Sequence, residues 1–156
     1  MNALTNVGGV TIDCNELMTD EEFIAQLKRH EGVREYAYQD SLGYWTIGVG
    51  RLIDKRKGGR LRPDEIDYLL SNDVTQACSE VKAALPWFDK LTVNRQQVLI
   101  NMAFNLGTKG LLGFKNTLKM IENGQYDAAA DAMLKSKWAT QVGRRAVELS
   151  EQMRRG

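Results

Sequence analysis

Two acidic residues and a threonine in one glycine- and aromatic-rich stretch have the types needed for hydrolytic chemistry. Glu31 and Asp40 are nine residues apart, and Thr46 follows six residues later. Two carboxylates near one cleft can act as general acid and general base if their surroundings favour different protonation states. A threonine hydroxyl beside the base could hold a water molecule. Acid, base and held water are what inverting hydrolysis of a glycosidic bond requires.

The expected positions of these residues suit such a division of roles. A carboxyl at the C-terminal end of a helix faces the negative end of the helix dipole, which disfavours its ionised form, so Glu31 suits the acid role. Asp40 lies in a polar turn, where amides and water favour the ionised form. The same residues have an ordinary structural explanation, because Asp often starts a turn before Gly and a Glu at a helix end is usually solvated. Spacing alone leaves both explanations open.

The elements that would position these residues can be predicted from local patterns. Thr19 and Glu22 form a T-x-x-E capping box, which predicts a helix that ends before Gly32. In residues 36–53, aromatic and β-branched residues alternate between glycine turns, a pattern typical of a short β-meander. The helix end would therefore present Glu31, and the meander would present the other two candidates.

The rest of the chain has helical periodicity. Pro63 opens a predicted helix over residues 63–85, and shorter helical patterns follow it. Residues 93–106 are apolar nearly all round, as expected of a buried central helix. The predicted fold class is α+β. The predicted parts are a flexible N-terminal extension (1–18) and a single domain (19–156), divided into a β-containing lobe (19–62), a linking helix (63–85) and a helical lobe (86–156).

Composition narrows the function classes. The 156 residues are 43% apolar and 26% charged, with a net charge of +1, and this balance argues against a nucleic-acid binder. Cys14, Cys78 and the only histidine, His30, lack the spacing of metal ligands, so we expect two reduced thiols and no cofactor. The chain has neither an 18-residue apolar run nor a signal-peptide pattern.

The string HEGVREYAYQDSLGYWTIGVG (30–50) resembles the phage-type lysozyme (endolysin) family, in particular that of the T-even coliphages. The family pattern is a helix ending in Glu-Gly, a stretch with Tyr, and then Asp-x-x-Gly-x-x-Thr-Ile-Gly-x-Gly. It is matched by Glu31, Gly32, Tyr38, Asp40, Gly43, Thr46, Ile47, Gly48 and Gly50. The segments LINMAFNLGTKGLLGFKNTL (99–118), SKW (136–138) and RRA (144–146) also resemble the family's helical lobe. The resemblance spans about residues 20–150.

The resemblance implies a lysozyme-like fold and an N-acetylmuramidase. Such an enzyme hydrolyses the β-1,4 bond between N-acetylmuramic acid and N-acetylglucosamine in bacterial peptidoglycan and so lyses the host cell. It implies Glu31 as general acid, Asp40 as base or electrostatic partner, and Thr46 as the residue that positions water. Arg145 matches a family arginine that approaches the acid across the cleft. The residues on groove-lining positions are Leu52, Phe104, Asn105, Thr117 and Trp138.

The family resemblance also implies the setting in which the enzyme acts. We expect a monomer without a cofactor that binds peptidoglycan and no nucleic acid. It would stay in the host cytoplasm until a separate holin opens the inner membrane, and would then act on peptidoglycan in the periplasm.

Some positions depart from the family pattern. Arg51 stands where the family has His, and an ion pair with Asp73 is the predicted replacement for a His–Asp pair. Leu42 replaces an acidic residue beside Asp40, and Ala132 replaces a groove amide.

Three other readings compete with a hydrolase. A lambda-type transglycosylase needs only the acid and leaves a 1,6-anhydro sugar, whereas the Asp40–Thr46 pair favours water as nucleophile. A catalytically inactive wall-binding or phage structural module would not need Glu31, Asp40 and Thr46 together. A helix-turn-helix nucleic-acid binder is disfavoured by the near-neutral charge and the absence of a basic recognition helix.

Overall fold

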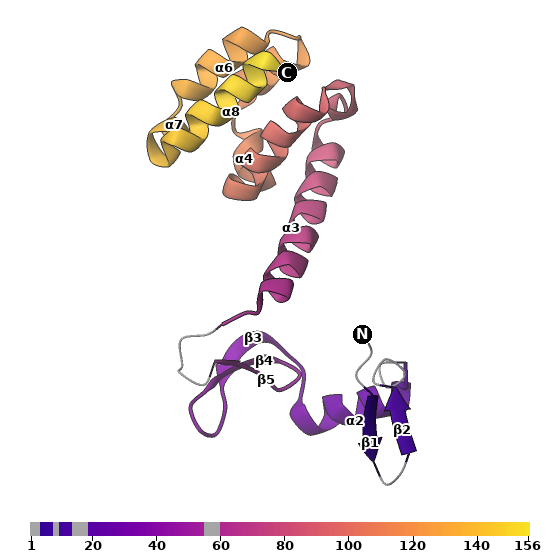
Figure 1. Ribbon diagram of the computed structural model, residues 1–156. Coiled ribbons are helices and arrows are strands. Elements are labelled where there is room, and N and C mark those ends of the chain that lie inside the picture. The colour runs from indigo at the N-terminus through magenta and orange to yellow at the C-terminus, as the bar shows by residue number, and fades with distance from the viewer. Residues whose placement is uncertain (1–3, 8–9, 14–18, 55–59) are drawn as a thin grey trace. The chain divides into compact units, whose positions relative to one another are not determined.

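The computed structural model describes residues 4–7, 10–13, 19–54 and 60–156 and divides the chain into two compact units (Figure 1). The first unit covers residues 1–63, and its described residues form short strands and one helix. The second unit covers residues 64–156 and is helical. The expectation of an α+β protein is confirmed, and the two units are described separately below.

The first unit begins with two strands, β1 (Leu4–Val7) and β2 (Val10–Asp13). They pair antiparallel, with Val7 opposite Val10. These two strands were not predicted within the expected N-terminal extension (1–18). The signals for them are the β-branched run of β2 and the Gly-Gly dipeptide between the strands, which two-residue hairpin loops favour. That the extension is flexible stays a prediction.

Helix α2 (Glu21–Glu31) sets the position of Glu31. Its N-cap is Asp20, whose side chain accepts a hydrogen bond from the backbone N–H of Phe23 at 3.0 Å. The predicted cap at Thr19 is therefore wrong by one residue. The end is as predicted, because Gly32 adopts a φ of 78° and its N–H donates to the Lys28 carbonyl at 2.9 Å. Glu31 is thus the last helical residue.

A three-stranded antiparallel sheet follows, in the order β3–β4–β5, and confirms the predicted meander. The strands are β3 (Arg34–Gln39), β4 (Trp45–Gly48) and β5 (Arg51–Asp54). In the register, Thr46 on the central strand is opposite Tyr38 on one side and Leu52 on the other. Residues directly opposite each other across strands share a face, so the sheet itself brings these three side chains together.

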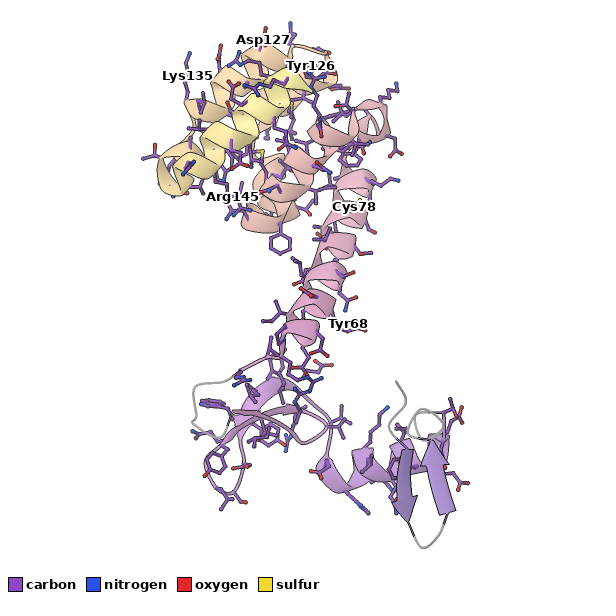
Figure 2. All side chains as sticks on the ribbon, in the orientation of Figure 1. Tyr68, Cys78, Tyr126, Asp127, Lys135 and Arg145 are labelled. Atoms are coloured by element: carbon purple, nitrogen blue, oxygen red, sulfur yellow. The ribbon has the colours of Figure 1, made fainter. Side chains whose placement is uncertain are left out.

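The second unit consists of helices. They are α3 (Pro63–Ala84), the 3₁₀ turn η1 (Phe88–Lys90), α4 (Val93–Leu112), α5 (Lys115–Glu122), α6 (Tyr126–Leu134), α7 (Lys137–Val142) and α8 (Arg144–Arg155). Helix α3 starts at the proline and ends one residue before the predicted end. Tyr68 and Cys78 project from it (Figure 2). None of the helices in the described residues is long and apolar enough to cross a membrane.

Helix α4 is the centre of this unit, as expected, but it is longer than predicted. It reaches Leu112 across a break at Gly107, where φ is 75° and ψ is 159°. Its inner face supplies the largest share of the core, through Val98, Leu99, Met102, Ala103 and Leu111. Phe104 lies on the other face and is 45% exposed, so α4 is not buried on all sides as its sequence pattern predicts.

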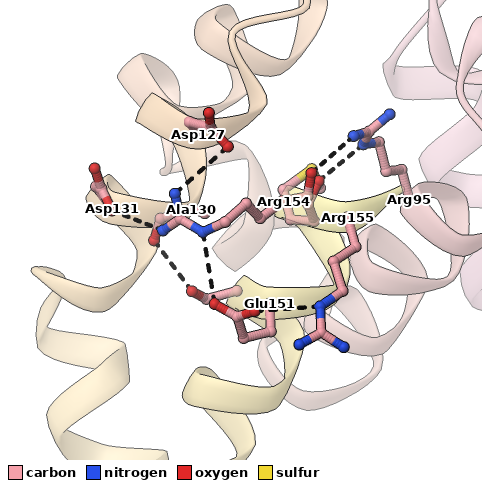
Figure 3. Close-up of polar contacts among 9 residues, drawn as sticks. Arg95, Asp127, Ala130, Asp131, Glu151, Arg154 and Arg155 are labelled. Atoms are coloured by element: carbon pink, nitrogen blue, oxygen red, sulfur yellow. Dashed lines mark hydrogen bonds and ion pairs between the residues drawn. The ribbon is translucent and has the colours of Figure 1, made fainter.

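Arg154 on α8 forms ion pairs with two aspartates on α6 (Figure 3). Arg154 on α8 contacts Asp131 on α6 at 2.8 Å, Asp127 on α6 at 3.5 Å and Glu151 on its own helix at 3.5 Å. The hydrogen bond and positive charge of Arg154 lower the pKa of Asp131, and the same hydrogen bond raises the pKa of Arg154. These contacts hold the C-terminal end of α8 against α6.

Candidate functional site

One pocket in the first unit collects the predicted catalytic residues. Its volume is about 410 Å³. Its lining consists of Glu31, Tyr38, Asp40, Leu42, Tyr44, Thr46, Gly50 and Leu52. Three elements contribute to this pocket. Glu31, the proposed acid, is at the end of α2, and Asp40, the proposed base, is in the β3–β4 turn. Thr46, the proposed water-holding residue, is on the central strand β4. Leu52, a predicted groove residue, is 37% exposed at the same pocket.

Asp40 organises the turn between β3 and β4. Its Oδ1 accepts hydrogen bonds from the backbone N–H groups of Leu42 and Tyr44, both at 2.9 Å. Its own N–H donates to the Tyr44 carbonyl at 2.9 Å, and its carbonyl accepts from Gly43 at 3.0 Å. Within the described parts of the chain, Oδ2 makes no hydrogen bond. The turn-forming explanation is thus correct, and it leaves one carboxylate oxygen for a ligand.

Thr46 is buried, with 5% of its surface exposed, on the central strand. Its hydroxyl donates to the Tyr44 carbonyl at 3.2 Å. A hydroxyl has one proton and two lone pairs, so with its proton used in this way Oγ1 can only accept a further hydrogen bond. Tyr44 therefore links the two residues, because its N–H binds Asp40 and its carbonyl binds Thr46.

Glu31 is exposed, and its carboxyl group lies against Gly50 in the β4–β5 turn. The helix end fixes its backbone, while the side chain reaches the pocket that Asp40 and Thr46 line. In this arrangement Glu31 has a carboxyl group that can donate a proton. Oδ2 of Asp40 and Oγ1 of Thr46 can each accept a hydrogen bond.

The helical unit has a second pocket of about 440 Å³ that includes Phe104 and Arg145. The pocket is lined by Leu70, Val74, Gln97, Ile100, Asn101, Phe104, Arg145 and Gln152. Arg145 projects from the start of α8 (Figure 2). Its Nε and Nη2 donate to Oδ1 of Asn101 at 2.9 and 2.7 Å, and Nη2 also donates to the Asn101 carbonyl at 3.3 Å. These bonds hold the guanidinium in one orientation.

Asn105 is exposed and is oriented by Trp138. The indole N–H of Trp138 donates to Oδ1 of Asn105 at 2.8 Å. Because an indole N–H can only donate, the amide oxygen must face it, and the amide NH₂ is left as a donor. Trp138 itself is 4% exposed and meets Phe114 edge to face, with ring centroids 6.0 Å apart. Trp138 is therefore packed inside the helical unit, and it orients the Asn105 amide.

Thr117 is 6% exposed and lies on α5 in the core. Of the predicted groove residues, Leu52, Phe104 and Asn105 are exposed and Arg145 is half-buried, whereas Thr117 and Trp138 are packed inside. Contact of any of them with sugar stays a prediction, as does the Arg51–Asp73 ion pair, which would join residues of different units.

Two contributors were not predicted from the sequence. Asn101 holds Arg145 across 44 residues of chain, and no local pattern indicates such a pair. Tyr44 acts through its backbone, which any residue type could supply. The alternation of β3 and β4 could have predicted that Tyr38 shares a face with Thr46.

Comparison with known families decides the relationship. A sequence model of the family described as phage lysozyme matches residues 28–155, which include the pocket residues of the first unit and nearly all of the second unit. The chain belongs to the phage lysozyme family.

Relatives of this phage lysozyme family member come from several sources. It is 29% identical over 147 residues to probable T4-type lysozyme 1 of Dictyostelium discoideum, covering 77% of this chain and 86% of that protein. It is 30% identical over 120 residues to the endolysin of Salmonella phage P22, covering 71% and 77%. It is 27% identical over 161 residues to the pre-baseplate central spike protein Gp5 of Enterobacteria phage T4, covering 85% of this chain and 28% of that protein.

Proposed function

We propose that the chain is a peptidoglycan hydrolase of the endolysin type that cleaves the β-1,4 bond after N-acetylmuramic acid. The observation that carries the proposal is the pocket that unites Glu31, Asp40 and Thr46. Membership of the phage lysozyme family supports it, as do relatives named endolysin in Salmonella phage P22 and peptidoglycan hydrolase gp36 in Pseudomonas phage phiKMV.

The attacking water would be held by two acceptors. Oδ2 of Asp40 and Oγ1 of Thr46 can each accept one of its protons, because Oδ1 and the Thr46 proton are engaged with backbone groups. A water that donates both protons in this way presents a lone pair to the sugar. As its oxygen bonds to the anomeric carbon, one proton passes to Asp40.

Glu31 would supply the matching proton. As the glycosidic bond breaks, its carboxyl protonates the leaving sugar oxygen, so proton gain at Asp40 balances proton loss at Glu31. Water enters on the face opposite the leaving group, and the product has inverted configuration at the anomeric carbon. A lambda-type transglycosylase would not need the Asp40–Thr46 arrangement.

The helical unit has groups suited to binding N-acetyl sugars. The fixed NH₂ of Asn105 can donate to an acetamido carbonyl, and the exposed face of Phe104 can pack on a pyranose ring. The oriented guanidinium of Arg145 can bind anionic groups of the substrate. We propose these three, with Leu52, as substrate-binding residues.

The biological role follows from the same relationship. We propose that the enzyme acts as a monomer on bacterial peptidoglycan during host-cell lysis, after a separate holin has opened the inner membrane.

Glu31→Gln tests the acid role. The variant keeps the shape of the side chain but cannot release a proton, so fragment release from purified peptidoglycan should fall by at least about 100-fold. The matched control is Glu35→Gln, which changes an exposed Glu on β3 outside the pocket and should keep activity within about 3-fold of the unchanged protein, as expected of a surface substitution. Equal rates for the two variants would contradict the proposal.

A further inference from the structure

We infer that Gly50 is a positioning residue that fixes the carboxyl group of Glu31, an inference that rests on the proposed acid role of Glu31. Gly50 lies in the turn between β4 and β5 with a φ of 64°. It lines the same pocket as Glu31, Asp40 and Thr46.

The observation behind this is the closeness of the two residues. A β-carbon on Gly50 would lie 2.8 Å from Cδ of Glu31 and 3.1 Å from its Cβ, and closer still to Oε2. Carbon atoms in proteins do not approach to 2.8 Å without a bond between them. The volume that any side chain at position 50 would occupy is therefore already filled by the carboxyl group of Glu31.

The group that would give way is the carboxyl group rather than the backbone. Cδ and Oε2 are at the far end of a flexible side chain, whereas the main chain of Glu31 is fixed by the last turn of α2. A substitution at Gly50 should therefore displace the proton donor while the sheet and helix stay in place. A displacement of about 1 Å in an active site can reduce the rate about 100-fold.

Gly48 provides a matched control. It is the last residue of β4, two positions before Gly50, and has a φ of 68°, yet a β-carbon placed on it would meet no atom within 4 Å. Alanine is disfavoured at a positive φ in both positions, so both variants carry similar backbone strain. Only the variant at position 50 displaces Glu31.

The test compares Gly50→Ala with Gly48→Ala. Thermal midpoints are measured, together with kcat and KM for soluble, uncross-linked glycan fragments of peptidoglycan. We expect both thermal midpoints to fall, with that of Gly50→Ala falling at least as far. We expect kcat of Gly50→Ala to be about 100-fold below that of Gly48→Ala, with KM values within about 3-fold of each other. A purely structural role would change kcat alike in the two variants.

Several results would overturn the inference. One is that Gly50→Ala and Gly48→Ala have equal kcat values. Another is that Gly50→Ala has a raised KM but an unchanged kcat. If Gly50→Ala does not fold, the same substitution is made in a Glu31→Ala background. Recovered folding there supports the contact with the Glu31 side chain, and continued failure to fold overturns it. Failure of the proposed function would look different, because neither the unchanged protein nor Gly48→Ala would then cleave the fragments.

Discussion

Asp40 uses its two carboxylate oxygens differently. Oδ1 holds the turn through two backbone N–H groups, whereas Oδ2 accepts no hydrogen bond from the described residues. Asp40 lines the pocket. The turn-forming and catalytic explanations of this residue therefore do not compete. The turn fixes the carboxylate, and a fixed carboxylate is what a base needs in order to hold water without reorganisation.

Asp40→Asn and Asp40→Ala separate these two contributions. Asn keeps an oxygen that can accept both N–H groups but removes the base, so kcat should fall by at least about 100-fold while the free energy of unfolding changes by less than about 1 kcal/mol. Ala removes the acceptor as well and should cost about 1–3 kcal/mol of stability in addition. Both quantities come from steady-state kinetics and urea unfolding. An active Asn variant would show that Asp40 serves only the turn.

At the level of elements, the sequence predicts best those features that depend on residues close together in the chain. The helix end at Gly32 and the β-meander follow from residue types within a few positions, and both are confirmed. The Asn101–Arg145 and Asn105–Trp138 contacts join residues 44 and 33 positions apart, and they depend on how α4 packs against α7 and α8. Periodicity predicts which face of a helix is buried, but not which polar side chains meet. The predicted helix ends at residue 106, directly before the break at Gly107, and the continuation of α4 to Leu112 was not predicted.

The Arg154–Asp131 ion pair between α6 and α8 predicts that the stability of the fold depends on pH. Arg154 lowers the pKa of Asp131 in the folded chain, so the ionised carboxylate stabilises the fold fully above the unfolded-state pKa of about 4. That stabilisation is lost as pH falls through the lower folded-state pKa. We expect the thermal midpoint of the unchanged protein to fall between about pH 5 and about pH 3, and to fall less in Asp131→Asn.

The control for this prediction is Asp127→Asn, whose contact with Arg154 is longer, at 3.5 Å. The pH dependence of its thermal midpoint should be closer to that of the unchanged protein than the pH dependence of Asp131→Asn is. Because Asp131 and Arg154 are near the surface, about 1 M salt should reduce the difference between Asp131→Asn and the unchanged protein. If the thermal midpoints of Asp131→Asn and the unchanged protein had the same pH dependence, the Arg154–Asp131 ion pair would not contribute to stability.

At the scale of the whole molecule, the family match runs through both units, and each unit has its own part of the proposed chemistry. The first has the acid, the base and the water-holding hydroxyl in one pocket. The second has an amide and a guanidinium that are held in fixed orientations by Trp138 and Asn101. The proposed catalytic residues could be named from the sequence because they lie within one 16-residue segment, 31–46. The orienting residues could not, because only the folded helices bring them together.

The most direct test of the account is mass spectrometry of muropeptides released from purified peptidoglycan in water enriched in ¹⁸O. If Asp40 and Thr46 deliver water and Glu31 protonates the leaving sugar, each product will have a reducing N-acetylmuramic acid end that contains one ¹⁸O atom, and Glu31→Gln will release none above background. Products with 1,6-anhydro ends and no ¹⁸O would contradict the account, because they would mean that the sugar's own hydroxyl, and not a held water, attacks the anomeric carbon.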